Sequence, residues 1–221
     1  SAEQRTELQS RLDDWSEAIS PSTDEAARNY DALREAIVQF WYDAALDESD
    51  RSTSVLRLAL ISLADIPLNL PEFFYQRVRS LILYDLPSGA MASWAQNERL
   101  LQRLIRQMPQ LEALEIDRPY APRATPSAFI FSVPTILENL PQLQRLVLTN
   151  QNIALSSSDL DMLTGARQLR HLDLSGNRLA QGNRPSFHAL TLDYLGLDRM
   201  QLSQWPMGIG SDALSRISEL S

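Results

Sequence analysis

The chain has 221 residues and the composition of an ordinary globular protein, with 44% hydrophobic and 22% charged residues. Its formal net charge is −8 at pH 7, and the absence of cysteine excludes disulfide bonds, zinc–thiolate sites and cysteine nucleophiles within these residues. No apolar run is long enough for a transmembrane helix, so a membrane partner is not expected.

The negative charge is concentrated at the start of the chain. Residues 1–50 hold 13 acidic residues against 4 arginines, a net charge of −9, whereas residues 51–221 hold 15 against 16, a net charge of +1. Nucleic-acid binding requires clustered positive charge, which this distribution lacks. The sequence therefore predicts no nucleic-acid partner and indicates a solvated helical face in residues 1–50.

Residues 1–50 predict two helices. Apolar residues recur at helical spacing from Leu8 to Ile19, and Ser20-Pro21 should end the first helix because proline disfavours helix in the residue before it. The segment Ser22 to Glu25 has the pattern of a capping box that starts the second helix. The apolar face of the second helix carries Tyr30, Leu33, Ile37, Phe40, Trp41 and Ala44.

The rest of the chain repeats one apolar pattern. From Leu169 to Leu179 the sequence reads L-x-x-L-x-L-x-x-N-x-L without a mismatch, with Asn177 in the asparagine position. The first, fourth and sixth positions are apolar again in segments that start at residues 55, 78, 111, 143, 169 and 192. Chance matches within amphipathic helices are the alternative, but six matches in order favour leucine-rich repeats. The frame residues before Leu169 are Val55, Leu58, Leu60, Val78, Leu81, Leu83, Leu111, Leu114, Ile116, Leu143, Leu146 and Leu148, and those of the last repeat are Leu192, Leu195 and Leu197.

This pattern predicts an α/β solenoid of about six leucine-rich repeats, with short parallel strands and helices or turns on the convex side. Alternate side chains of a strand point to opposite faces, so the fourth and sixth residues of each repeat should point into the interior. Residues 51–221 would form this domain. The end of a solenoid exposes its apolar core, so residues 1–50 are expected to form an N-terminal helical cap.

Insertions explain the two longest repeats. Trp94 to Met108 predicts a full convex helix, and Arg118 to Pro126, which contains three prolines, predicts a loop. Shorter convex turns are expected around Ile136 to Leu140 and Asp159 to Leu163. Ile217 to Ser221 begins a further repeat and stops inside its strand, so we expect the repeat domain to be truncated and the chain to be a piece of a longer protein.

Most of the repeats lack asparagine at the asparagine position. A buried amide without a hydrogen-bond partner is costly, and the asparagine of such repeats bonds the turning backbone. Only one repeat has asparagine there, so the other turns are expected to be satisfied through water or local geometry. From the first repeat to the last, the position holds Leu63, Leu86, Pro119, Gln151, Asn177 and Met200.

The outward side chains of the strands form the candidate binding surface, because a concave strand face presents a continuous array of side chains. Mixed polarity favours a protein partner, two tyrosines are candidate anchors, and the excess of carboxylates favours a basic partner surface. The alternative is a face that is merely solvated. The candidate protein-binding residues are Tyr84, Glu115, Asp117, Arg145, Thr149, His171, Asp173, Ser175, Tyr194 and Asp198.

No motif predicts catalysis by these residues. His171 and His188 are the two histidines, and neither has a nucleophile at a recognisable spacing. Asp159-Leu-Asp161 lacks the further ligands of a metal site, and no basic residue follows Gly208-Ile-Gly210 to make a phosphate loop. The sequence therefore predicts no enzyme activity, metal or cofactor for this stretch of chain.

With an acidic helical opening, the Phe40-Trp41 pair, the Asp50-Arg51 junction and degenerate repeats, the chain resembles the leucine-rich-repeat effectors of pathogenic bacteria over roughly residues 30–221. These proteins are delivered by type III secretion and include the IpaH-like and XopL-like ubiquitin ligases. Bacterial repeats of this kind often contain Leu-Pro pairs, which occur here at Leu70-Pro71, Leu86-Pro87 and Leu140-Pro141.

The resemblance implies a host target protein as the partner, secretion into a host cell, and a separate C-terminal ubiquitin-ligase domain in the whole protein. No ligase residue can be carried over, because the IpaH-like class uses a catalytic cysteine and this chain has none. The alternative is a structural or regulatory solenoid of a bacterial protein that stays in the cytoplasm or lies on the cell surface.

Overall fold

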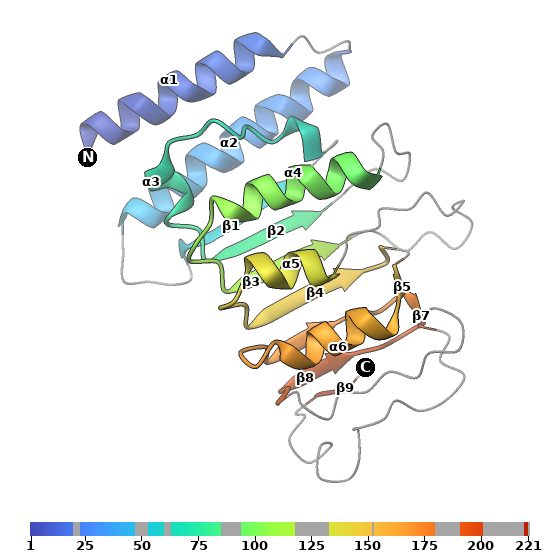
Figure 1. Cartoon of the computed structure of the whole chain (residues 1–221). Helices are drawn as coiled ribbons and strands as arrows, with labels where there is room; N and C mark the ends of the chain where they lie inside the picture. Colours follow the sequence, from blue (N-terminus) through green and yellow to red (C-terminus); the bar gives the residue numbers. More distant parts are fainter. Residues whose placement is uncertain are drawn as a thin grey trace.

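The computed structural model describes residues 1–19, 23–46, 53–59, 63–84, 94–117, 133–151, 153–179, 191–200 and 219–220. Within them, seven strands form one parallel sheet whose strand order follows the chain (Figure 1). This confirms the predicted α/β class with short parallel strands. The strands are β1 (Val55–Ala59), β2 (Ser80–Tyr84), β3 (Ala113–Asp117), β4 (Arg145–Thr149), β6 (His171–Asp173), β8 (Tyr194–Gly196) and β9 (Glu219–Leu220).

The strands pair in the register that the sequence predicted from β2 onward. In β2 and β3 the second and fourth residues are buried, and their neighbours are half-buried or exposed. Equivalent leucines therefore stack across the sheet and form the interior. The row of buried paired leucines is Leu81, Leu114, Leu146, Leu172 and Leu195, and the backbone register continues to Leu220 in β9.

The prediction for the first repeat was wrong by two residues. Leu56 pairs with Leu81 and Leu58 pairs with Leu83, so β1 begins its frame earlier than the predicted Val55 start. Leu56 and Leu58 are 2% and 0% exposed. Leucine at 58 fits both frames, because a shift of two residues keeps the same face of a strand inward. Leu60, the third residue of the predicted frame, lies outside the described residues.

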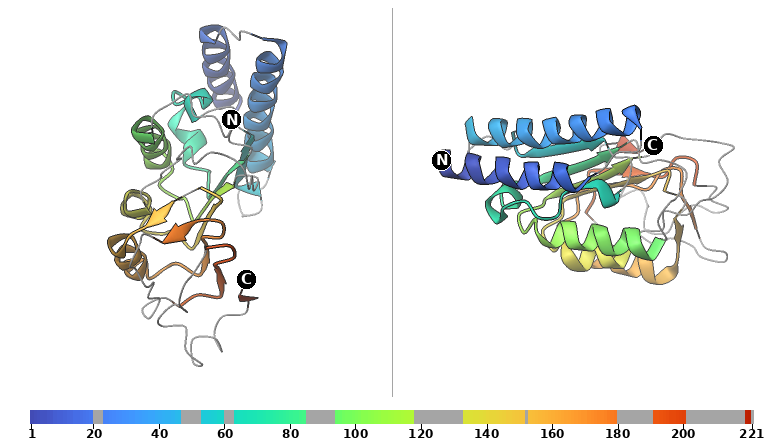
Figure 2. Two further views of the ribbon diagram at one scale, coloured as in Figure 1. Left: turned by 90° about the vertical axis from the view of Figure 1, so that its right-hand side faces the viewer. Right: turned by 90° about the horizontal axis from the view of Figure 1, so that it is seen from above.

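Helices cover one face of the sheet: α4 (Trp94–Arg106), α5 (Val133–Asn139) and α6 (Ser157–Gly165) (Figures 1 and 2). They confirm the helix predicted from Trp94 and the two shorter helical turns. The helix α6 begins at a capping box in which Ser156 and Asp159 bond each other's backbone N–H groups. The loop predicted for Arg118 to Pro126 lies outside the described residues.

Shorter elements complete the connections. The sequence did not predict η2 (Leu63–Asp65) and α3 (Glu72–Tyr75), which lie between β1 and β2. Beyond the ends of β4 and β6, β5 (Ala154–Leu155) and β7 (Arg178–Leu179) pair as a second, two-stranded parallel sheet.

The Asn177 side chain joins its unit to the preceding unit by hydrogen bonds. Its Nδ2 donates to the carbonyls of Leu148 and Leu174 at 2.5 and 2.8 Å, and its Oδ1 accepts from the backbone N–H groups of Gln151 and Ile153, both at 3.1 Å. The side chain is 4% exposed and has all four of these bonds. The role predicted for the asparagine position is therefore confirmed in this unit.

Gln151 occupies the same position one unit earlier. It is fully buried, and its Nε2 donates to the carbonyls of Ile116 and Thr149 at 2.9 and 2.7 Å. The prediction that water or local geometry satisfies this turn was wrong for these two carbonyls, because the longer amide reaches the preceding unit as the Nδ2 of Asn177 does. Unlike Asn177 Oδ1, Gln151 Oε1 has no hydrogen-bond partner among the described residues.

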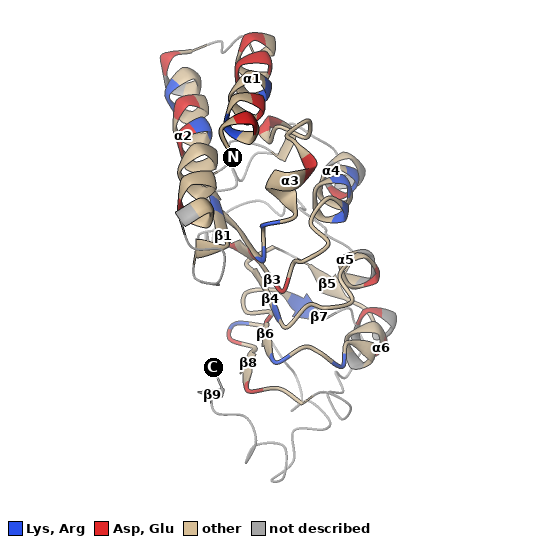
Figure 3. Cartoon of the chain, turned by 90° about the vertical axis from the view of Figure 1, so that its left-hand side faces the viewer, with Lys and Arg blue, Asp and Glu red and all other residues tan. Residues whose placement is uncertain are grey.

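The N-terminal helices α1 (Ala2–Ala18) and α2 (Asp24–Leu46) lie at the β1 end of the sheet (Figures 1 and 2). Figure 3 shows the acidic residues spread along both helices. Thr23, not the predicted Ser22, caps α2, since its Oγ1 accepts from the N–H of Ala26 at 3.1 Å. Ser22 lies outside the described residues.

Aromatic contacts join α2 to the segment before β2. The ring centroids of Phe40 and Phe74 lie 5.2 Å apart, and those of Trp41 and Phe73 lie 5.1 Å apart. The guanidinium of Arg77 lies 4.5 Å from the Trp41 ring centroid and donates to the carbonyl of Ala44 at 3.1 Å. These contacts make the helices part of one core.

That core is a single cluster of buried residues that runs from Leu8 in α1 to Met200 after β8. The buried polar side chains in the described part of the chain are Gln151, Ser175 and Asn177. None of the described helices combines the length and the apolar character that crossing a membrane requires.

Candidate functional site

The sheet has a second face, which α4, α5 and α6 do not cover, and we call it the strand face (Figure 2). Its side chains alternate with the buried leucines along β1, β2 and β3. In β4 the register is the same, but Val147 is itself buried. The strand face consists of Arg57, Ala59, Ser80, Ile82, Tyr84, Ala113, Glu115, Asp117, Arg145, Val147, Thr149, His171, Asp173, Tyr194 and Gly196.

An ion pair lies at the centre of the strand face. Arg145 Nε is 2.5 Å from Glu115 Oε1, which joins β4 to β3. At the start of the strands, Arg79 and Glu112 pair in the same way at 2.7 Å. Because each carboxylate is matched by a guanidinium, this part of the surface carries little net charge. The pairs therefore fix the positions of their side chains more than they attract a charged molecule.

A cluster of three side chains lies on β6 and β8. The rings of His171 and Tyr194 are stacked, with centroids 4.1 Å apart and planes 6° apart. The Tyr194 hydroxyl donates to Asp173 Oδ2 at 3.3 Å, and the N–H of Ser175 donates to Asp173 Oδ1 at 2.9 Å. Both the ring pair and the carboxylate are thus fixed in place before any partner arrives.

Gly196 makes room for this carboxylate. A Cβ atom at that residue would lie 2.4 Å from Asp173 Oδ1, closer than real Cβ contacts allow. Asp173 is thereby held against β8, and the glycine is required for the close approach.

The third outward position, at the C-terminal end of the strands, carries the most exposed groups. Tyr84 is 38% exposed, and Asp117 on β3 accepts a hydrogen bond from the Thr149 hydroxyl on β4. Asp198 is also exposed and pairs with Arg199 at 3.1 Å. This edge of the surface therefore combines an aromatic ring with carboxylates.

Two sequence predictions about the surface need correction. Ser175 is only 7% exposed, and its Oγ accepts from the N–H of Asp198 at 3.2 Å, so it serves the turn rather than the surface. Arg57 was missed because the candidates included no residue of the first repeat, although it points outward in both the predicted and the observed frame. Its exposed side chain adds a cation to the β1 end of the strand face, beside Ile82. Eight of the other nine predicted residues lie at outward positions of the strands, and Asp198 lies in the turn that follows β8.

The described residues hold no group of three or more histidine, aspartate or glutamate side chains that could bind a metal ion. Asp159, considered as a possible ligand, instead accepts from the N–H and hydroxyl of Ser156 at 2.7 and 2.6 Å. His188 and Gly208-Ile-Gly210 lie outside the described residues. The described strand face presents aromatic rings, carboxylates and guanidinium groups.

Comparison with known proteins gives no match to a protein-family model, a curated protein or a solved structure. The functional argument therefore rests on the residues of this chain.

Proposed function

We propose that the chain is a leucine-rich-repeat solenoid that recognises a protein partner through the strand face. The repeat assignment is supported by leucines that stack in one register from unit to unit, and by the Asn177 side chain, which bonds the backbone of the preceding unit. Such arrays are defined by units that bury their apolar side only against neighbouring units.

The observation that carries recognition is the preordering of the strand face. The Arg145–Glu115 pair and the His171–Tyr194 stack are formed within the free chain. Ordering side chains on association typically costs about 0.5–1.5 kcal/mol for each flexible group, so a surface already held in place retains more of its contact energy. Exposed tyrosine is also the kind of residue that anchors interfaces.

The proposal extends to the kind of partner on the basis of the sequence resemblance alone. A host protein would be the target, and the chain would be the target-binding part of a larger secreted effector that carries a ubiquitin-ligase domain. The whole protein can be tested for ligase activity in a reconstituted ubiquitination reaction, where the absence of ubiquitin chains would count against the ligase assignment and leave strand-face recognition standing.

The strand face is tested by affinity capture from extracts of candidate host cells, with quantitative mass spectrometry. The informative variant is Tyr84→Ala with Asp117→Arg, because both side chains are exposed and neither packs in the core. It should lower recovery of the partner at least about tenfold, equivalent to roughly 1.4 kcal/mol. Tyr194→Ala with Asp173→Arg should act in the same direction at the other end of the surface.

The matched control is Gln102→Arg on α4, on the helix-covered side of the sheet. It adds the same kind of charge and should leave recovery unchanged. Loss of the partner in this control together with retention in the strand-face variants would place binding on the helical side. Thermal melting of every variant separates lost recognition from lost folding.

A further inference from the structure

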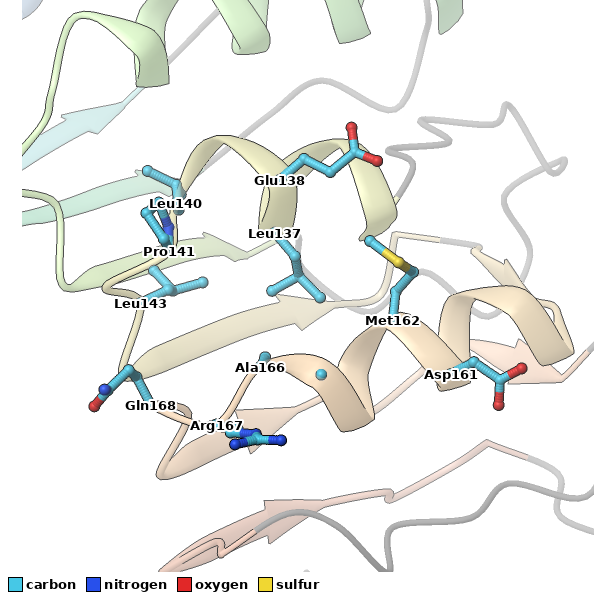
Figure 4. A pocket seen from close by; sticks show the side chains of 11 residues that line it. Leu137, Glu138, Leu140, Pro141, Leu143, Asp161, Met162, Ala166, Arg167 and Gln168 are labelled. Carbon is cyan, nitrogen blue, oxygen red and sulfur yellow. The ribbon is translucent and has the colours of Figure 1, made fainter.

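A groove of about 450 Å³ lies between α5 and α6, on the helical side of the sheet and away from the strand face (Figure 4). This volume is within the range of small-molecule and side-chain binding sites, about 300–1,000 Å³. Helix α5 contributes Leu137 and Glu138, and α6 contributes Asp161, Met162 and Gly165.

The floor of the groove is apolar, and the groove is open beside Gly165, the last residue of α6. Met162 is 37% exposed, although it is a large apolar side chain, and a Cβ added at Gly165 would meet no atom within 4 Å. The backbone there is fixed, because the N–H groups of Ala166 and Arg167 donate to the carbonyls of Leu163 and Gly165 at 3.0 and 2.9 Å. The space above Gly165 is therefore a preformed hollow beside a flexible, polarisable methionine.

The rim of the groove is charged. Glu138 and Asp161 lie on either side of Met162 in Figure 4, one from each helix. Arg167 and Gln168 follow α6 on the turn into β6 and bring N–H donors to the groove. A peptide matches this set, because its carbonyl oxygens can accept from these donors while a cationic side chain can meet the two carboxylates.

We propose that this groove is a second binding site, which takes a peptide segment of a partner protein with an apolar side chain next to an arginine or lysine. The apolar side chain fills the hollow over Gly165 and Met162, and the cation lies against the exposed carboxylate of Glu138.

The test uses a phage-displayed library of random 12-residue peptides selected on the immobilised chain. Enriched peptides are synthesised, and their dissociation constants are measured by fluorescence anisotropy. They should share an apolar residue within a few positions of an arginine or lysine, and their affinity should fall as salt rises. Gly165→Leu, which fills the hollow, and Glu138→Arg, which reverses a rim charge, should each weaken binding at least about tenfold.

Matched controls separate the site from general effects. Gln142→Leu adds a leucine on the exposed turn after α5, where it does not line the groove, and Glu17→Arg makes the same charge change on α1. Both should change affinity less than about twofold. Melting curves verify folding, and if Gly165→Leu does not fold, Glu138→Arg decides the test alone.

Several outcomes would overturn the proposal. These are no enrichment, enrichment of acidic or purely apolar peptides, equal binding to Gly165→Leu, and loss of binding in the Tyr84→Ala, Asp117→Arg variant, which would place the peptides on the strand face. Self-association of the chain that Gly165→Leu abolishes would identify a second copy as the occupant.

Discussion

At the scale of single residues, one backbone position repeats an unusual conformation. Asn150, Gly176 and Arg199 each precede the asparagine position of their unit, and their φ angles are 55°, 72° and 55°. The left-handed region is free of steric cost only for glycine, and it costs other residues roughly 1–2 kcal/mol, somewhat less for asparagine. The fold thus demands this turn in three successive units, and the sequence meets the demand best at Gly176.

This difference yields a paired prediction. Arg199→Gly should raise the free energy of unfolding by about 0.5 kcal/mol, because relief of the left-handed strain exceeds the entropy that glycine adds to the unfolded chain. Gly176→Ala should lower it by at least about 1–2 kcal/mol, since the new Cβ would lie 2.0 Å from Asn150 Oδ1 in a positive-φ residue. Urea titration measures both, and a loss of stability in Arg199→Gly would contradict the strain argument.

Gln151 holds the asparagine position of its unit, but within the described part of the chain its amide oxygen lacks the hydrogen bonds that Asn177 makes. Gln151 Oε1 is buried and has no hydrogen-bond partner among the described residues. One unit later, Asn177 Oδ1 accepts from residues 151 and 153. By the same spacing, one donor for Gln151 would be residue 119, which is a proline and has no N–H. The sequence therefore offers Gln151 one backbone N–H fewer than the same spacing gives Asn177.

At the scale of elements, a tyrosine–carboxylate bond joins α2 to η2. The Tyr30 hydroxyl donates to Asp65 Oδ1 at 2.9 Å. Burial, and then the hydrogen bond and negative charge of Asp65, raise the pKa of Tyr30 to about 12 from an ordinary value of 10.0. A raised pKa in the folded state stabilises the fold below pH 10, and this contribution is lost as pH rises from 10 toward 12.

We therefore predict that the chain loses stability between pH 10 and 12, and that Tyr30→Phe loses less over the same range. Burial also raises the pKa of Tyr75, which donates to the Pro67 carbonyl at 2.8 Å, so a residual slope should remain in Tyr30→Phe. Denaturant midpoints at pH 9, 10 and 11 measure the slope, and identical slopes in the two proteins would show that the Tyr30 bond does not couple to folding.

The sequence predicted elements well where a pattern was long and poorly where it was short. The register of β2 to β8 followed from leucines at fixed spacing, and α4 followed from helical periodicity. The four-residue α3 was missed because one turn of helix has no periodicity to detect. The frame of β1 was misplaced because Leu56 and Leu58 alternate just as Leu58 and Leu60 do.

The sequence predicted which side chains of the candidate site point outward, but not which groups those side chains contact. Alternation along the strands told which side chains point outward, including Glu115 and Tyr194. It could not tell that Ser175 is covered by the next turn, or that His171 stacks on Tyr194, because both depend on the distance between units. The α5–α6 groove likewise depends on tertiary packing, and no local pattern marks it.

At the scale of the whole molecule, the acidic start of the chain combines two roles. One side of α1 and α2 is acidic and exposed, and the other belongs to the single core through Leu12, Phe40 and Trp41. In the proposed solenoid, the apolar end of the first strand must be covered, and a charged outer face would keep such a cover soluble. Covering and charge can be separated by experiment, because they depend on different faces of the same helices.

The final prediction makes that separation. Deletion of residues 1–46 removes ten acidic residues and four arginines, so the net charge changes from −8 to −2. It also uncovers Phe73 and Phe74 beside β1, and we expect an aggregating product in size-exclusion chromatography.

The control reaches the same net charge in the complete chain by changing exposed carboxylates to amides and should stay monomeric, because the apolar face is still covered. If the control aggregates equally, solubility rests on charge, and a deletion product that stays monomeric and melts cooperatively would show that the helices are not a cap. The six residues of the control are Glu3, Glu7, Asp14, Glu17, Asp31 and Glu35.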